Sequence, residues 1–180
     1  MACELTAGFL LDCKESIGGI KALYIGNHGD FLSGITTDLN GYITALPEAR
    51  LYKFICPKHT GNFTEEVASS VENGTIFYTQ TVTATFFTMT ATRRLNLELM
   101  AKNRLVVFVQ DNNNNIFMIG RMDGAEVTAA SSTTGTAKGD LNGYTITFTA
   151  EEKNKAFLLD PYTTNPFDNF VDITVEQPVA

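Results

Sequence analysis

Residues 75–92, TIFYTQTVTATFFTMTAT, decide the fold class of this chain. A β-strand turns successive side chains to opposite faces, and threonine occupies every second position from 79 to 85. The intervening residues are mainly apolar or aromatic, so one face is rich in hydroxyl groups and the other can enter a core. We therefore predict a long strand whose polar row, Thr79, Thr81, Thr83 and Thr85, points away from the core.

The alternation changes phase after Phe86 and Phe87, where the apolar set moves to the other face. A slip of one residue exchanges the two faces of a strand, so the pattern predicts a β-bulge or bend there. Residues 63–71 read as an earlier strand, and the turn at Asn73-Gly74 joins the two into a long hairpin.

One helix is expected after this hairpin, over residues 93–103. Leu95, Leu99 and Met100 recur there at helical spacing, and Thr92 is the expected N-cap. Further strands are indicated by runs of apolar, aromatic and β-branched residues at 20–25, 50–56, 104–110, 116–120, 144–151, 156–159 and 171–175. Residues 126–128 either extend the strand before them or begin another, and the small polar residues 129–139 predict a loop.

The pentapeptide DLNGY occurs twice, at residues 38–42 and 140–144. Asn40-Gly41 suits a type I′ hairpin turn. We interpret the repeat as two uses of one hairpin turn, with an internal duplication as the alternative.

One helix among about nine strands predicts a mainly β protein: an antiparallel β-barrel or sandwich with one flanking α-helix. The 24 threonines and 14 asparagines in 180 residues agree, because threonine favours strands and asparagine favours turns. We expect an N-terminal arm over residues 1–19 and a single β-rich domain over residues 20–180.

The formal charge of −7 argues against a nucleic-acid reader, which needs a basic face. Five of the seven net negative charges fall in residues 121–180. The three cysteines, Cys3, Cys13 and Cys56, are an odd number, and the chain start has no basic region of a secretory signal. Together with the absence of a long apolar run, this predicts a soluble protein made in a reducing compartment and without a membrane partner.

Catalytic and metal motifs give little signal. Cys56 and His59 form a lone pair, whereas a zinc site needs about four ligands. The two Asp-Leu-Asn segments resemble the start of a calcium loop, but a hairpin turn explains them better. The adjacent acidic pairs at 65–66 and 151–152 should point to opposite faces of a strand, one residue solvated and one at the rim. We therefore expect a non-enzymatic protein with no cofactor and no metal.

Arg93 and Arg94 are the one adjacent basic pair of the sequence. On a helix the pair could bind phosphate, but pairing with Glu98 or with a neighbouring subunit is the preferred interpretation.

The chain start has the pattern Leu5-Thr-x-Gly8, then Cys13-Lys-x-Ser16 and Gly-Gly19-Ile-Lys21. This pattern resembles the start of structural proteins in tailed phages of Bacteroidetes, including crAss-like phages. The order that follows is also similar to the tail-tube fold: a threonine-rich hairpin, a helix, a strand, an asparagine-rich turn, IFMIG and GDLNGYTITFTAEE. The likeness spans most of the chain and implies a β-barrel with one flanking helix that assembles into stacked rings.

The resemblance implies a virion protein, made in the bacterial host cytoplasm, that forms homo-oligomeric rings of the tail tube or neck as a conduit for DNA. A hexamer or dodecamer is expected, with other tail or neck proteins as partners and genomic DNA passing without specific binding. The alternatives are a head–tail connector ring, an auxiliary or capsid decoration protein and, less favoured, a secreted β-sandwich binding module. The candidate lumen wall is the row Thr79, Thr81, Thr83 and Thr85, and the candidate inter-subunit contacts are Cys13, Ser16, Arg93, Arg94, Thr133 and Thr134.

Overall fold

The computed structural model describes residue 8 and residues 14–178. Its strands are β1 Ile20–Asn27, β2 Thr36–Thr37, β3 Tyr42–Ala45, β4 Ala49–Ile55, β5 Gly61–Ser70, β6 Thr75–Phe87, β7 Leu105–Asp111, β8 Ile116–Ile119, β9 Glu126–Thr133, β10 Gly143–Glu152, β11 Phe157–Leu159 and β12 Ile173–Glu176. The α-helix α1 spans Ala91–Lys102, and a 3-10 turn, η1, spans His28–Phe31.

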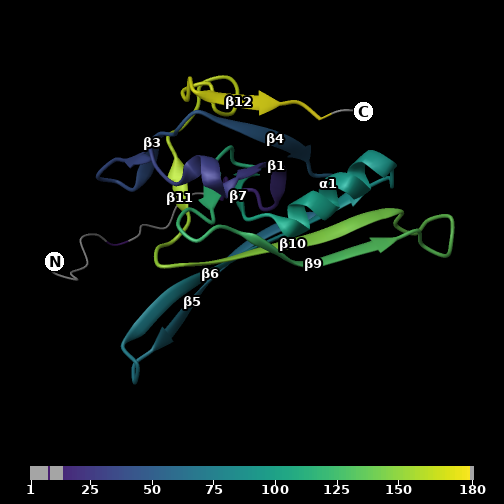
Figure 1. Ribbon diagram of the computed structural model, residues 1–180, viewed down its shortest axis with the longest axis horizontal. Coiled ribbons are helices and arrows are strands. Elements are labelled where there is room, and N and C mark those ends of the chain that lie inside the picture. Colours follow the sequence, from purple (N-terminus) through teal and green to yellow (C-terminus); the bar gives the residue numbers. More distant parts are fainter. Residues whose placement is uncertain (1–7, 9–13, 179–180) are drawn as a thin grey trace.

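These strands form two sheets (Figure 1). The eight-stranded sheet is mixed and has the order β12-β4-β1-β7-β8-β11-β3-β2, while the four-stranded sheet is antiparallel and has the order β5-β6-β10-β9. The expected mainly β class with one helix is confirmed. Of the two expected architectures, no closed barrel is found in the described part of the chain, and the sheets instead pack face to face.

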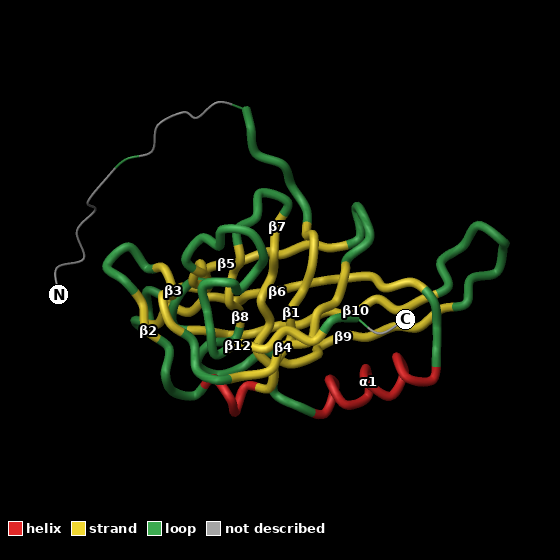
Figure 2. Tube along the Cα trace, turned by 90° about the horizontal axis from the view of Figure 1, so that it is seen from above, coloured by secondary structure: helices red, strands yellow, loops and turns green. Residues whose placement is uncertain are grey.

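One hydrophobic core lies between the two sheets. The eight-stranded sheet contributes Leu23, Val107 and other residues, and the four-stranded sheet contributes Val82 and Phe148. All four side chains are essentially inaccessible to solvent. The helix α1 adds Met100 to this core and runs alongside the strands at one border of the molecule (Figure 2). This core fixes which face of the four-stranded sheet points outward.

A second core lies on the other face of the eight-stranded sheet. It combines Phe108 of the central strand β7 with Ile43 and Leu51, which lie towards opposite ends of the sheet. These residues share one cluster because the strands between them also contribute buried side chains to this face of the sheet. Phe167 and Phe170, from the turn before β12, complete the cluster.

The hairpin of β5 and β6 is confirmed. Of the expected bulge or bend near Phe86 and Phe87, the bulge is wrong, and the chain instead bends directly after Phe87. The pairing of β6 with β10 is regular from Tyr78 to Phe87, and the strand then ends. The phase of the sequence pattern changes because Thr88 leaves the strand with φ of 66°. A β-branched residue rarely adopts this left-handed region.

The helix starts two residues earlier than expected, at Ala91. Thr90, and not Thr92, is the N-cap, because its hydroxyl accepts a hydrogen bond from the Arg93 N–H at 3.3 Å. Part of the expected loop 129–139 is a strand instead, because residues 129–133 belong to β9 and pair with β10. Small residues support a strand here because an edge strand is held mainly by its ladder hydrogen bonds.

The two DLNGY segments have different structures, so the interpretation as one repeated hairpin turn is wrong. At the first, Asp38 accepts hydrogen bonds from the Asn40 and Tyr42 N–H groups. Only Gly41 of the Asn40-Gly41 pair has positive φ, so the turn is not type I′. At the second, Asp140 accepts from the N–H groups of residues 136 and 137, which precede it.

Candidate functional site

The predicted threonine row of β6 lies on the outer face of the four-stranded sheet. Thr79, Thr81, Thr83 and Thr85 are half-buried there, while the alternate residues Gln80, Val82 and Ala84 are buried on the core side. The direction predicted for this row is therefore confirmed.

A second row of threonines on β10 lies beside the first. Thr83 and Thr147 are cross-strand partners whose hydroxyl oxygens are 3.2 Å apart, and those of Thr85 and Thr145 are 3.1 Å apart. Each hydroxyl thus has a protein partner on the adjacent strand. This pairing orients the hydroxyl groups across the two strands.

The rows continue onto the edge strands. Thr149 of β10 shares a hydrogen bond of 2.9 Å with Thr128 of β9, and Thr64 of β5 is the cross-strand partner of Thr81. We call this set the threonine face: Thr64, Thr79, Thr81, Thr83, Thr85, Thr128, Thr145, Thr147 and Thr149.

Charge is distributed unevenly over this sheet. None of the strands β5, β6, β9 and β10 contains a lysine or arginine. The charged side chains that the strands place on the outer face are acidic: Glu66 pairs with Thr79, Glu151 lies opposite Thr79 on the other side, and Glu126 pairs with Thr149. Of these, Glu126 forms an ion pair with Arg104 at 3.5 Å. The face is therefore neutral at its centre and acidic at its margins.

The two acidic pairs do point to opposite faces, but their inner members are more deeply placed than expected. Glu65 accepts hydrogen bonds from the Gln80 side chain at 3.3 Å and from the Ala156 N–H at 2.6 Å. Glu152 is buried and accepts from the Met122 and Asp123 N–H groups at 2.9 and 3.1 Å. Both carboxylates hold neighbouring segments in place.

Burial raises the pKa of Glu152, and the two backbone N–H groups and nearby His28 partly oppose this. His28 is itself buried, and its Nε2 lies 3.0 Å from the Met122 carbonyl oxygen. The pair secures the connection between β8 and β9 from two sides. Both side chains are buried, and neither lines the cavities beside α1 or at the end of β6, so we assign the pair a structural role.

In the described residues, neither edge strand of this sheet pairs with a further strand: β5 pairs only with β6, and β9 pairs only with β10. The helix α1 packs against β9 at one of the two edges. Neighbouring strands alternate in direction, so the two edge strands run in opposite directions. Unpaired backbone groups on long edge strands can accept a strand from another chain.

The expected inter-subunit arginines lie at the junction of β6 and α1. Arg93 donates from its guanidinium to the carbonyl oxygens of Phe87 and Thr88, within its own chain. The expected partner of the pair, Glu98, instead bonds to Lys102. Arg94 is exposed, and no ion pair of its side chain is found in the described part of the molecule.

The other expected contact residues are scattered. Cys13 lies outside the described residues, and Ser16 is exposed. Close to Ser16, Asn113 donates to and accepts from the backbone of Ile17, so this part of the expected arm lies on its own chain. Thr133 and Thr134 are exposed at the end of β9, where the Thr133 hydroxyl accepts from the Gly135 N–H at 3.2 Å. Thus no single site collects the expected contact residues.

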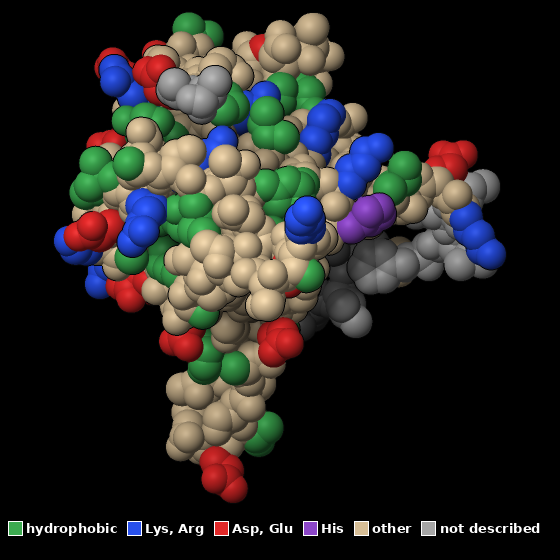
Figure 3. Space-filling model, turned by 90° about the vertical axis from the view of Figure 1, so that its right-hand side faces the viewer, with side chains coloured by type: hydrophobic (Ala, Val, Ile, Leu, Met, Phe, Trp, Pro, Cys, Tyr) green, Lys and Arg blue, Asp and Glu red, His purple; other side chains and the backbone are tan. Residues whose placement is uncertain are grey.

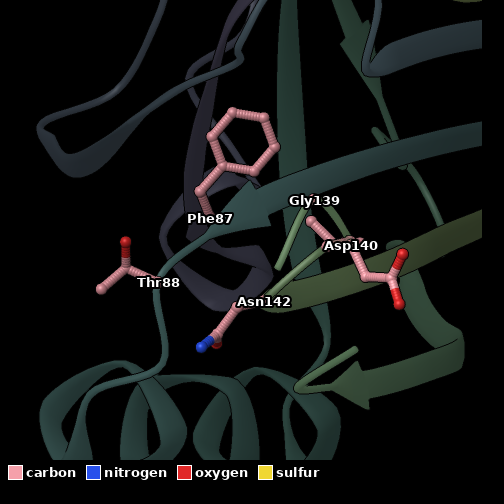
Figure 4. Close-up of a pocket in the computed structure, with 6 residues that line it drawn as sticks. Phe87, Thr88, Gly139, Asp140 and Asn142 are labelled. Atoms are coloured by element: carbon pink, nitrogen blue, oxygen red, sulfur yellow. The ribbon is translucent and has the colours of Figure 1, made fainter. Parts of the chain in front are cut away.

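A shallow cavity of about 510 Å³ lies where β6 ends and β10 begins (Figure 4). Phe87, Thr88, Asp140 and Asn142 line it, and the Asp140 carboxylate points away from Thr88. Hydrogen bonds from two backbone N–H groups lower the pKa of Asp140. The carboxylate is thus occupied as a turn cap, and no base or nucleophile faces it among the lining residues.

Other chemical features are few in the part of the chain that the structure describes. No group of three or more His, Cys, Asp or Glu side chains there could hold a metal ion. Cys56 is a buried free thiol, and burial raises its pKa to about 11. No helix among the described residues is long and apolar enough to cross a membrane.

The β10 threonines and the buried carboxylate of Glu152 escaped the sequence interpretation as site residues. The alternation of residues 144–151 marks the β10 row, but nothing local shows that it pairs with β6, some 60 residues earlier. Comparison with protein-family models, with curated proteins and with solved structures finds no match to this chain.

Proposed function

We propose that this chain is a structural protein of a phage virion whose copies form rings of the tail tube or neck, with the threonine face lining the DNA conduit. The observation that carries the proposal is the neutral face of the four-stranded sheet, which has acidic margins and no lysine or arginine in any strand. The resemblance of the sequence to phage tail proteins supplies the biological setting.

The chemistry of this face suits passage of a polyanion. Basic groups bind phosphates and release counterions, so a basic wall would retain DNA. Neutral hydroxyl groups that already bond to each other, such as those of Thr83 and Thr147, offer no such attraction. Acidic residues at the margins add weak repulsion.

The unpaired edge strands of the sheet suit ring closure. Rotation about a ring axis keeps the direction of every strand relative to that axis. Because β5 and β9 run in opposite directions, β5 of one copy meets β9 of the next in an antiparallel arrangement. The same join repeats at every interface, so the sheets form one continuous antiparallel wall.

The width of such a wall is sufficient for a channel. Barrels of roughly 16–18 strands already leave an aqueous channel. Six copies, each with the four strands of this sheet, enclose a wider one. The threonine face then points inward and the eight-stranded sheet forms the outer layer.

Assembly of the purified protein tests the proposal. Light scattering over a concentration series, with negative-stain electron microscopy of the same samples, should show rings or tubes with a central hole. A chain that stays monomeric at the highest concentration reached would contradict self-assembly into rings. Closed particles without a hole, or shells, would favour the capsid decoration alternative.

A DNA-threading experiment tests the orientation of the sheet. We expect preassembled rings with Thr81→Lys, Thr83→Lys and Thr147→Lys to retain linear duplex DNA at low salt, since the new cations face the channel. A closed circle of the same length cannot thread a closed ring and serves as the matched control. Equal retention of linear and circular DNA would show that the threonine face lies outside the channel.

A further inference from the structure

The hairpin of β5 and β6 extends beyond the rest of its sheet. The pairing of β10 with β6 ends at Tyr78, whereas β5 and β6 remain paired out to Ser70 and Thr75. Residues 66–77 therefore form a two-stranded projection, which we call the arm, and Figure 1 shows it reaching away from both sheets. An isolated two-stranded hairpin has marginal stability in water, so a contact on this arm would stabilise it.

The arm exposes apolar side chains. Val67 and Ile76 are 55% and 54% exposed, and they lie on the face that continues the core side of the sheet. Val71 at the tip is 95% exposed, and Phe77 is exposed on the opposite face. Several large apolar groups on so short a projection indicate a contact surface.

The arm is also acidic. Glu66 and Glu72 are exposed, and residues 60–92 contain no lysine or arginine. In Figure 3 the projection carries acidic side chains and no basic ones on the face in view, whereas basic side chains are spread over the body. Its contact surface should therefore combine apolar side chains with basic neighbours.

A surface of this kind lies beside α1. A cavity of about 270 Å³ opens between α1 and the strands β1 and β4, and we call it the α1 groove. Tyr52 and Leu99, each 49% exposed, line it together with the more deeply placed Phe54 and Met100. The groove is thus large enough for apolar side chains of an incoming hairpin, though not for its backbone.

The helix α1, which forms one side of this groove, is net basic, although its basic residues do not line the groove itself. The helix carries Arg93, Arg94 and Lys102 against one acidic residue, Glu98. Lys102 pairs with Glu98, and the Arg93 guanidinium donates to carbonyl oxygens of its own chain. The net charge of the helix is opposite to that of the arm. Apolar surface and charge are therefore complementary between the two regions.

The arm and α1 lie at opposite ends of β6. The strand has 13 residues, with the arm at its start and α1 shortly after its end, so on the order of 40 Å separates the two. The arm cannot reach the groove of its own chain, and Figure 1 shows the two regions on opposite sides of the molecule. We propose that the arm of one copy docks into the α1 groove of a second copy.

This contact is heterologous, and it runs along the strand direction instead of around the ring. A heterologous contact that does not close repeats without limit. Rings joined in this way stack into a tube, so the inference favours a tail tube over a single neck ring. It rests on the proposed function only in taking the partner to be a second copy of this chain.

Cross-linking between differently tagged copies tests the contact. One copy carries Ile76→Cys and the other, distinguishable by mass, carries Leu99→Cys. A short bismaleimide linker should join the two kinds of copy, above the background of the unmodified chain with its native cysteines. Cross-links between two Ile76→Cys copies without the mixed product would overturn the proposal, because they show arm-to-arm pairing.

Disruption of the arm gives a second test. We expect Val67→Asp with Ile76→Asp to raise the concentration needed for stacking roughly 10- to 100-fold while single rings persist. Val171→Asp, at a 93% exposed apolar residue outside both regions, is the matched control. Circular dichroism checks that each variant folds, and the cross-linking result does not depend on the double variant.

The outcomes separate this inference from the proposed function. Rings whose arm variants stack as well as the parent chain, with no mixed cross-link, would overturn the arm contact and leave the ring intact. Open chains with the mixed cross-link and no rings would support the arm contact and contradict the ring.

Discussion

The two sheets of this protein differ in how they use their faces. The central strands of the eight-stranded sheet, β1 and β7, are buried on both sides, and their sequences are almost continuously apolar. In the four-stranded sheet, β6 and β10 alternate between buried residues and half-buried threonines. The first sheet therefore supplies most of the stability, and the second leaves one ordered, polar face exposed, which is the face that we propose lines the conduit.

The largest expected difference between the sheets is the effect of removing a core side chain. Phe108 of β7 is fully buried, with ring centroids 5.6 Å from Phe31 and 5.3 Å from Phe167. We expect Phe108→Ala to lower the free energy of unfolding by about 3–5 kcal/mol. Thr83→Ala should lower it by less than about 1 kcal/mol, since one hydrogen bond at a half-exposed site is lost. Urea denaturation followed by circular dichroism measures both, and equal losses would contradict the division of roles.

Glu152 connects the four-stranded sheet to the turn after β8, so its removal tests how tightly the sheets are coupled. Glu152→Ala leaves the Met122 and Asp123 N–H groups without their acceptor and should cost about 1–3 kcal/mol. Glu152→Gln, which keeps an acceptor oxygen, is the matched control and should cost less. If both variants unfold at the parent urea midpoint, the carboxylate does not hold this turn.

Acid should loosen the cover of the eight-stranded sheet. Asp168 accepts hydrogen bonds from the N–H groups of residues 163–165 and the Thr163 hydroxyl, which lower its pKa to about 2. Its stabilising effect is present above the ordinary carboxyl pKa near 4. It is lost as the pH falls towards 2. Asp168→Asn should thus lower Tm at neutral pH and flatten its decline in acid, and a Tm series from pH 2 to 7 measures this.

The sign is reversed for Glu152. Its pKa is raised by burial, so its contribution is largest at low pH and is lost as the pH rises above the ordinary glutamate value. Glu152→Gln should therefore reduce any decrease of Tm on the neutral side of the same series. Two results together would show that neither group governs the pH dependence. Glu152→Gln would have the same change of Tm with pH as the parent on the neutral side, and Asp168→Asn would have the same change as the parent on the acid side.

The smallest effect is expected on the threonine face itself. Thr83→Val with Thr147→Val removes both partners of one hydrogen bond and keeps two β-branched side chains. Replacing both partners together can be nearly neutral, so the free energy of unfolding should change by less than about 0.5 kcal/mol. A thermal melt of the monomer measures it. A loss above about 2 kcal/mol would mean that the threonine pairs contribute substantially to folding and do not serve only as the proposed lining of the channel.

The local sequence pattern was sufficient to predict the positions of most strands and of the helix. The alternation in β6 and β10 and the apolar run of β7 reflect the immediate surroundings of each residue. The spacing of Leu95, Leu99 and Met100 predicted the helix, but of these three only Met100 is buried. The outward direction of Thr79 to Thr85 followed from the same alternation. Such features depend on burial of one face and are visible in a short window.

The local sequence pattern did not predict which distant strands pair or where the backbone adopts an unusual φ. β12 pairs in parallel with β4 more than 100 residues away, and nothing in residues 173–176 specifies that partner. From the sequence, Thr88 was read as part of a continuing strand, because a β-branched residue rarely adopts a left-handed φ. In the structure Thr88 has that φ, and the strand ends before it. The two DLNGY segments differ because their aspartates cap different neighbouring N–H groups.

The placement of the four-stranded sheet in the assembly is the central claim, and a cryo-electron microscopy map of the assembled protein tests it most directly. We predict a closed ring in which β6 and β10 face the axis with their threonines, and β5 of each copy pairs with β9 of the next in antiparallel register. A map in which α1 or the eight-stranded sheet lines the axis, or in which β5 and β9 remain unpaired, would contradict it.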